Sequence, residues 1–403
     1  MKKRFLSLFL ALTLLAGCSG TPAENSSSSD ASSENVSSEQ TNEGGSGVEE
    51  YNVTETAEGF VTEVNTKSVR FLGRVYQNLI ETDDYFAFGS SGIEFKFTGT
   101  KLEAEIISNS PSVKYEDQQR VAVYIDNFDE PHKIISLEEY RIWYTLAENL
   151  SDTEHLVKIV KICGYGQRLQ VAVPNLRTDK GTVKPSDKRE ITIEFIGDSI
   201  TAGHGIEGGE KNSRSVENSE LTYAALTAKH FNADYNIVAR SGVSLSFGYG
   251  GAKGDFKQMY EAWDYYHGKS SNNKWDFASN PVDIVVINVG TNDYWAGIAN
   301  KADAEGSRQT FTNEYIEFLK FVREKNPGAT IIAGLGPMSY HLYPEIENAV
   351  NAMDDRGIHA LKLEPQNPSS TDGVGTENHP SIATNKKVSE TLIKAFQKFT
   401  GLE

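Results

Sequence analysis

The order of apolar and polar residues changes character near residue 187. Before that position, short runs alternate between apolar and polar residues and are separated by turn residues. Such alternation predicts strands with one buried face, and helical spacing is rare. These runs are residues 92–99, 102–107, 121–126, 155–162 and 169–173. We therefore expect an all-β jelly roll or sandwich over residues 55–187, with a weak helix or a loop at 139–148.

The remaining residues, 188–403, predict a different architecture, because strand-like runs alternate with helical ones. Strands are expected at 191–197, 234–239, 283–289, 330–335 and 359–363, and helices at 221–229, at 315–323 and in the closing segment. This order is typical of a parallel sheet covered by helices on both faces. The most apolar strand, 283–289, should lie at the centre of the sheet. Asn218 or Ser219 is available to cap the first helix.

The amino terminus predicts export. A basic start precedes an apolar run of about a dozen residues, which suits a secretory signal and is too short to span a membrane. The run ends in Leu15-Ala16-Gly17-Cys18, which resembles the lipobox of bacterial lipoproteins. The resemblance implies a signal peptide over residues 1–17, lipid on Cys18, and a protein anchored to the cell membrane outside the cytoplasm. An ordinary signal peptide with an incidental cysteine is the alternative.

Residues 18–54 are expected to form a disordered, acidic, Ser-rich tether, because they contain almost no large apolar side chain. Residues 19–66 hold ten acidic residues and no Lys or Arg. Removal of the three positive charges of the signal changes the formal net charge from −17 to −20. This acidity argues against nucleic acid as a partner. It favours a tether that holds the folded part away from a membrane that it does not enter.

The first region offers little catalytic chemistry. His132 and His155 are isolated, and we expect them to be structural or surface side chains. Cys163 is the only cysteine besides Cys18, and we expect it to be a buried small hydrophobe without a disulfide. Nothing has the spacing of a metal site, so no metal and no cofactor is expected. The neighbouring aromatics at 143–144 either bind a glycan or belong to the core.

Polar or glycine-containing segments follow the predicted strands of the second region. They are Gly197-Asp198-Ser199, Ser241-Gly242, Gly290-Thr291-Asn292-Asp293 and His379-Pro380-Ser381. The carboxyl ends of parallel strands lie at one edge of a sheet, so these segments can meet. Acyl transfer needs a nucleophile, a base and donors for an oxyanion. We expect Ser199 to be the nucleophile and His379 the base, with the N–H groups of Ser199 and Gly242 and the Asn292 amide as donors.

Neighbouring residues are expected to support this site. Gly197 would allow a sharp turn that a branched residue could not make. Asp198 and Asp293 should fix their loops rather than act in catalysis. Tyr294 and Trp295 follow the Asn-Asp pair and are candidates for stacking on the face of a sugar, with core packing as the alternative.

The same segments resemble the conserved blocks of the SGNH, or GDSL, hydrolase superfamily. An amino-terminal β-domain joined to such a hydrolase, together with the stretch 275–288, is most like carbohydrate esterase family 2. The resemblance covers roughly residues 60–400. It implies a jelly roll followed by a flavodoxin-like, three-layer SGNH domain. It also implies an esterase that removes acetyl groups from carbohydrates such as xylan or glucomannan through an acyl-enzyme.

One position departs from the superfamily pattern. Many members place an Asp three residues before the catalytic His, and Thr376 occupies that position in this chain. Asp372 and Glu377 lie nearby at other offsets and are candidates for orienting His379. A backbone carbonyl can also fix the tautomer of the imidazole, although it stabilises the imidazolium less than a carboxylate does. We favour a Ser-His dyad supported by a carbonyl.

Two other functions stay open. The same residues could act on another acyl substrate, such as acetylated peptidoglycan or a lipid. No apolar lid is evident, however, and the loop at 248–251 is small, polar and unlike a P-loop. The second alternative is a glycan-binding lipoprotein without turnover, against which the presence of Ser199, Asn292 and His379 argues.

Overall fold

The computed structural model describes residues 53–77, 84–112, 114, 117–165, 169–209, 214–248, 253–262, 274–299, 301–370 and 372–403. The predicted signal peptide, Cys18, the tether up to residue 52 and residues 249–251 of the polar loop lie outside these ranges. The chain from Glu50 to Glu403 forms one compact unit. Within the described ranges, no helix has the length and apolar character needed to cross a membrane.

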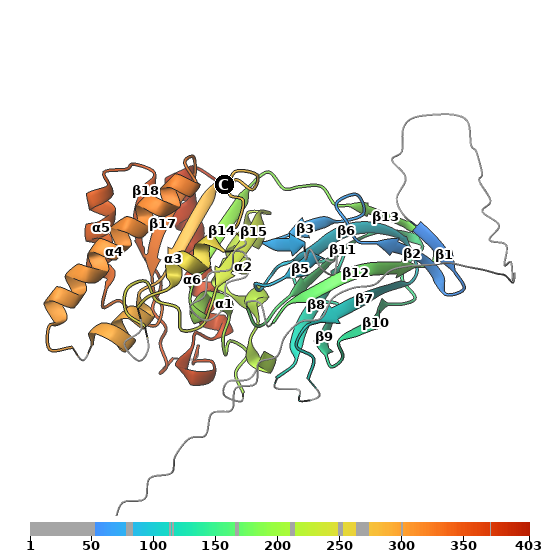
Figure 1. The fold of residues 1–403 in the computed structure, drawn as a ribbon, viewed down its shortest axis with the longest axis horizontal. Coiled ribbons are helices and arrows are strands. Elements are labelled where there is room, and N and C mark those ends of the chain that lie inside the picture. The colour runs from blue at the N-terminus through green and yellow to red at the C-terminus, as the bar shows by residue number, and fades with distance from the viewer. Residues whose placement is uncertain are drawn as a thin grey trace, which may run out of the picture. The chain divides into compact units, whose positions relative to one another are not determined.

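The first region is built from two antiparallel sheets (Figure 1). One sheet contains β1 (Val53–Thr56), β2 (Gly59–Glu63), β12 (Val171–Thr178), β5 (Asp84–Phe86) and β4 (Val75–Gln77), with β7 (Leu102–Ser108) on β12 and β10 (Arg141–Ala147) on β7. The other contains β13 (Thr182–Pro185), β6 (Gly92–Gly99), β11 (Thr153–Lys161), β8 (Gln119–Ile125) and β9 (Lys133–Leu137), with β3 (Arg70–Leu72) on β6. Alternate residues of β6, such as Phe95 and Phe97, fill one shared core with residues of β7 and β12. The all-β prediction is confirmed.

The expectation of a weak helix or loop at 139–148 is wrong, because this segment forms β10. Its pairing with β7 is interrupted by a bulge between Thr145 and Ala147. Tyr144 faces the core, whereas Trp143 on the opposite face covers the guanidinium of Arg177 at 4.5 Å. Large aromatic side chains therefore follow one another on opposite faces of β10. This hides the alternation of apolar and polar residues that is expected of a strand.

The second region contains one parallel sheet of five strands in the order β15-β14-β16-β17-β18. The strands are β14 (Thr192–Gly197), β15 (Asp234–Ala239), β16 (Ile284–Asn288), β17 (Thr330–Leu335) and β18 (Ile358–Lys362). In chain order this is 2-1-3-4-5, the flavodoxin-like arrangement. The central strand, β16, is buried at all five positions. The predicted α/β class is confirmed.

Helices cover both faces of this sheet (Figure 1). One face packs against α2 (Tyr223–His230) and α6 (Ile382–Thr400), and the other against α3 (Phe256–Glu261), α4 (Ala304–Lys325) and α5 (Tyr343–Met353). Short helical turns are α1 (Ser199–Ala202), η2 (Arg214–Val216), η3 (Ser219–Leu221), η5 (Asp293–Ile298) and η6 (Thr376–Asn378). Asn218 caps η3 rather than α2, so the predicted cap belongs to the preceding turn.

Buried charges join the two regions. Arg74, which follows β3, is fully buried and forms an ion pair at 3.0 Å with Glu194 of β14. The same guanidinium donates hydrogen bonds to the carbonyl oxygens of Tyr260 at 2.7 Å and Ala262 at 3.0 Å. A second buried pair joins Lys158 of β11 to Glu220 of η3 at 2.7 Å. The strand that leads to Ser199 is therefore fixed from its amino-terminal half.

Candidate active site

Ser199 lies at the carboxyl end of β14, in the turn that begins α1. Asp198 caps this turn, since its carboxylate accepts a hydrogen bond from the N–H of Ile200 at 3.0 Å. A Cβ on Gly197 would overlap the side chain of Thr201. Close approach to Thr201, and not an unusual backbone angle, therefore explains the glycine at this position.

The structure brings His379 to Ser199. The Nε2 atom of His379 lies 2.8 Å from Oγ of Ser199, although the two residues are 180 positions apart in the sequence. Ser199 follows the first strand of the sheet, and Asn292 follows the third, β16, which lies beside it. Ligands of open α/β sheets bind at such a switch in strand order. The hydroxyl and the imidazole are therefore positioned for proton transfer.

Among the residues that the structure describes, no carboxylate bonds the Nδ1 side of the His379 ring. Its Nδ1 atom is covered from solvent and has no hydrogen-bond partner among the described residues. The carboxylate of Glu377 binds Nε2 of His204 at 3.1 Å instead, and that of Asp372 pairs with Lys387. Three groups favour a protonated His379 ring and so raise its pKa: the backbone carbonyl of Thr376 first, then the charge of the Glu377 carboxylate, and then the Glu377 carbonyl. This placement agrees with the carbonyl-supported arrangement, whose catalytic role stays a prediction.

The environment keeps His379 neutral. Burial first, and then the charge on His204, lower the pKa of His379 to about 4. A neutral imidazole can accept the proton of a serine hydroxyl, whereas an imidazolium cannot. His379 is therefore available as a base down to acidic pH.

A second histidine lies beside the first and escaped the sequence analysis. His204 contacts the carboxylates of Glu217 through Nδ1 at 3.0 Å and of Glu377 through Nε2 at 3.1 Å. Its ring meets the ring of His379 edge-to-face, with centroids 4.6 Å apart. The hydrogen bond to Glu217, followed by the one to Glu377, raises the pKa of His204 despite partial burial. The sequence signal was a histidine between two glycines, five positions after Ser199.

Gly242 follows β15 and Asn292 follows β16, the two strands that flank β14. Gly242 has φ of 75°, which favours glycine, and a Cβ there would meet no described atom within 4 Å. The Asn292 amide nitrogen donates to the carbonyl of Val243 at 2.9 Å and lies 3.4 Å from the carboxylate of Asp198. Asn292 is thus held beside the turn of Ser199. The roles of both residues as oxyanion donors stay predictions.

Asp293 fixes the loop that follows Gly242. Its buried carboxylate accepts hydrogen bonds from the N–H groups of Leu245 at 3.0 Å, Ser246 at 2.6 Å and Phe247 at 3.0 Å. Burial raises the pKa of Asp293, and burial together with the charge of Asp293 raises the pKa of Asp198 to about 7. Both aspartates hold backbone segments in place, as the sequence analysis expected.

An aromatic cluster follows the Asn-Asp pair. The ring of Tyr294 stacks on His341 with centroids 4.0 Å apart, and Tyr294 also packs against the core. Trp295 meets Tyr294 edge-on at 5.0 Å and is 54% exposed. Of the two predicted stacking residues, Trp295 is therefore the one whose ring is open to solvent.

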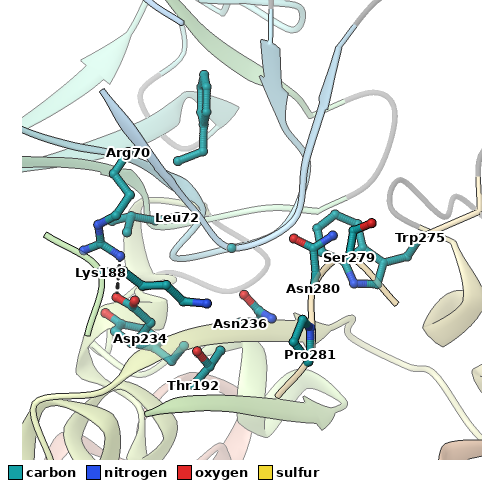
Figure 2. Close-up of a pocket in the computed structure, with 13 residues that line it drawn as sticks. Arg70, Leu72, Lys188, Thr192, Asp234, Asn236, Trp275, Ser279, Asn280 and Pro281 are labelled. Carbon is teal, nitrogen blue, oxygen red and sulfur yellow. Dashed lines mark hydrogen bonds and ion pairs between the residues drawn. The ribbon is translucent and has the colours of Figure 1, made fainter. Parts of the chain in front are cut away.

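One pocket between the two regions lies away from these residues. Figure 2 shows it between Arg70 and Asp234, which form an ion pair, and the segment with Trp275 and Asn280. Its floor includes Thr192, the first residue of β14. This pocket therefore opens at the amino edge of the sheet, opposite to the edge that carries Ser199. Among the described residues, no group of three or more His, Cys, Asp or Glu side chains could hold a metal ion.

The arrangement at the carboxyl edge suits acyl transfer. A serine hydroxyl touches a neutral imidazole, and an exposed glycine and a fixed amide flank the same turn. These are the elements that an acyl-enzyme mechanism requires.

Comparisons with known proteins also point to acyl transfer. The profile of the GDSL-like lipase/acylhydrolase family matches residues 195–364, a segment that includes Ser199, Gly242 and Asn292 and ends before His379. The chain is 35% identical over 232 residues to the cellulase/esterase CelE of Acetivibrio thermocellus. The aligned segment covers 54% of this chain and 26% of that protein. The chain thus spans about a quarter of that relative. It is 25% identical over 327 residues to an acetylxylan esterase/glucomannan deacetylase of Cellvibrio japonicus, covering 76% of this chain and 86% of the relative.

Solved structures extend the similarity to both regions. A family two carbohydrate esterase from Clostridium thermocellum, in complex with cellohexaose, has a TM-score of 0.72 at 27% identity and covers 83% of this chain and 100% of that one. An acetyl xylan esterase from the rumen bacterium Butyrivibrio proteoclasticus has a TM-score of 0.75 at 20% identity, with coverage of 85% and 98%. At 20% identity, the similarity to the Butyrivibrio proteoclasticus enzyme shows a shared fold and no more.

Proposed function

We propose that this chain, which belongs to the SGNH, or GDSL, hydrolase superfamily and is similar to family 2 carbohydrate esterases over both regions, is a carbohydrate O-acetyl esterase. Its substrates would be acetylated polysaccharides or oligosaccharides such as xylan or glucomannan. The contact of 2.8 Å between His379 and Ser199, at the carboxyl edge of a flavodoxin-like sheet, carries the proposal.

The reaction has two halves. Oγ of Ser199 attacks the acetyl carbonyl carbon while Nε2 of His379 takes the hydroxyl proton. The oxyanion is held by the N–H groups of Ser199 and Gly242 and by the amide of Asn292. Cleavage of the ester bond then releases the sugar hydroxyl, which receives the proton from His379. In the second half, His379 takes a proton from water and the resulting hydroxide attacks the carbonyl carbon of acetyl-Ser199. The bond from this carbon to Oγ then breaks, Oγ takes the proton back from His379, and acetate leaves.

The carbohydrate would be held beside this site by Trp295. Its exposed ring offers a flat apolar face to a sugar, and Tyr294 and His341 support its edge. A stacking residue next to the oxyanion donors would place an acetylated ring within reach of Ser199.

The test is an acetate-release assay on the full chain and on Ser199→Ala. The panel contains acetylated xylan, acetylated glucomannan, acetylated peptidoglycan and a small soluble acetyl ester. We expect wild-type protein to release acetate from a plant-type polysaccharide. Loss of the Ser199 nucleophile should lower kcat by about 10⁴-fold or more without a change in Tm.

Other outcomes of the assay separate the alternatives. Release from peptidoglycan alone would change the substrate while keeping the site. Binding of glycans without any acetate release by wild-type protein would overturn the proposal in favour of a glycan-binding protein.

We also propose that the protein is anchored outside the cytoplasm by lipid on Cys18, on the evidence of the lipobox resemblance alone. Cys18→Ser should move the protein from the membrane fraction to the soluble fraction. Unchanged fractionation would contradict the anchor.

A further inference from the structure

His204 connects the turn of Ser199 to the segment that ends in His379. It follows Gly203, which terminates α1, and its backbone N–H donates to the carbonyl of Ser199 at 3.0 Å. Its ring reaches Glu377, two residues before His379, and packs edge-on against the ring of His379. His204 thus contacts Ser199 through its backbone and His379 through its ring.

We propose that His204, held in a clamp between the carboxylates of Glu217 and Glu377, is a positioning residue for His379 that orients its ring and places a positive charge beside it. The proposal rests on the proposed function, because it assigns His379 the role of base. His204 does not itself touch the substrate or transfer the proton. It acts on the reaction through the position of the His379 ring.

The hydrogen-bond partners of His204 fix its charge. A neutral imidazole has one N–H donor, whereas both nitrogens of His204 face carboxylate oxygens, which accept only. Both bonds are made together when His204 is an imidazolium. Burial opposes ionisation of Glu217, but its bond to His204 lowers the pKa of Glu217 overall. The clamp therefore holds a positive charge beside the ring of His379.

The charges around the pair come from several elements. His379 faces His204 after α1 and Glu377 of η6. Behind Glu217 lies the buried ammonium of Lys161, at the end of β11, which also favours the ionised carboxylate. The imidazolium of His204 opposes protonation of His379, and the centroids of the two rings are 4.6 Å apart.

The clamp also holds an unusual backbone. Glu377 and Asn378, directly before His379, have φ of 55° and 59°, which non-glycine residues rarely adopt. The bond from His204 to the Glu377 side chain acts together with the bond from the N–H of Thr376 to the carbonyl of Gly205 at 2.8 Å. These contacts stabilise the conformation of the segment that leads into His379.

Residues of the first region hold Glu217, one of the two partners of His204, in place. The N–H of Gly164 donates to the second oxygen of Glu217 at 2.9 Å. The guanidinium of Arg120 donates to the carbonyl of Ser215 at 2.6 Å and pairs with Glu207 at 2.7 Å, so the loop that carries Glu217 is held from β8. The first region therefore contributes to the position of His204.

The test compares His204→Gln with His155→Gln. His155 is a matched control, because it is also bonded on both nitrogens, to Asp126 and to the carbonyl of Ser151, each at 2.8 Å, within the β-sandwich. In His204→Gln the positive charge is lost and the two carboxylates remain, so the pKa of His379 rises. The acidic limb of kcat/KM should move up by about one pH unit. Plateau kcat should fall by about tenfold or more with little change in KM, because the base is misplaced.

His155→Gln should leave the pH profile and kcat unchanged even where it lowers Tm. An unchanged acidic limb and kcat in folded His204→Gln would overturn the proposal.

A second measurement needs no turnover and does not depend on the His204→Gln variant. Nitrogen NMR of the wild-type imidazoles, assigned with His379→Gln, follows both rings during a pH titration. We expect His204 to stay protonated above the usual range for histidine while His379 stays neutral until acidic pH. Loss of the His204 proton at or below about pH 6.5, the usual value, would overturn the proposal. Absence of acetate release by wild-type protein would overturn the proposed function and leave this titration valid.

Discussion

The two edges of the parallel sheet use their polar residues in opposite ways. At the amino edge, Arg74 binds Glu194, and Arg70 and Arg189 both bind Asp234. At the carboxyl edge, buried polar atoms of Ser241, Thr291 and His379 have no hydrogen-bond partner among the described residues. Buried polar groups without partners cost stability, whereas matched charges hold distant segments together.

The residues that stabilise the fold and the residues proposed for catalysis therefore lie at different edges of the sheet. Paired charges at the amino edge join the first region to the strand that leads to Ser199. At the carboxyl edge, the segments after β15 and β16 carry the hydroxyls of Ser241 and Thr291, which no described residue bonds. Substitutions at the two edges should therefore change different measurements.

Loss of one partner at the amino edge should give the largest effect on stability. Arg74→Met leaves Glu194 as a buried carboxylate without its cation, which should lower the free energy of unfolding by about 3–5 kcal/mol. Urea unfolding measures this change. Because the site lies at the other edge, kcat below the melting transition should stay the same.

The double substitution Arg74→Met with Glu194→Leu sharpens this prediction. Removal of both charges should restore most of the lost stability, because no unpaired ion remains. A double variant as unstable as Arg74→Met would show that packing, rather than charge pairing, joins the regions.

Loss of a donor at the carboxyl edge should lower kcat with a smaller effect on stability. Asn292→Ala removes one proposed oxyanion donor and should reduce kcat by about 10²–10³-fold. Asn236→Ala is the matched control, because this buried amide lies at the amino-edge pocket. Equal losses of kcat in the two variants would contradict the division between the edges.

The smallest effect is expected at Asp372. Its carboxylate pairs with Lys387 and does not contact His379, so Asp372→Asn should leave kcat unchanged. Steady-state kinetics on a soluble acetyl ester checks this. A loss of about a hundredfold or more would assign Asp372 to the support of His379 instead.

Much of the scaffold followed from periodicity. The predicted strands 234–239 and 330–335 coincide with β15 and β17, since buried parallel strands give continuous apolar runs between turn residues. The meeting of Ser199 and His379 also followed from the shared edge of a parallel sheet. By contrast, β10 was missed, because a bulge and Trp143 obscure its alternation.

The surroundings of His379 could not be predicted in the same way. The contacts of His204 join residues 13 and 173 positions apart through loops that have no periodic pattern. Glu377 was a candidate to orient His379 because it is near in sequence, yet its left-handed backbone carries its carboxylate to His204. Side-chain partners in loops depend on tertiary contacts that spacing does not encode.

Covalent labelling tests the central claim, that Ser199 at the carboxyl edge is the nucleophile. The full chain is treated with a fluorophosphonate, and the labelled peptide is identified by mass spectrometry. We predict modification of Ser199 in wild-type protein, slower modification in His379→Gln, and none in Ser199→Ala. Modification of a different residue, or acetate release by Ser199→Ala at the wild-type rate, would contradict the account.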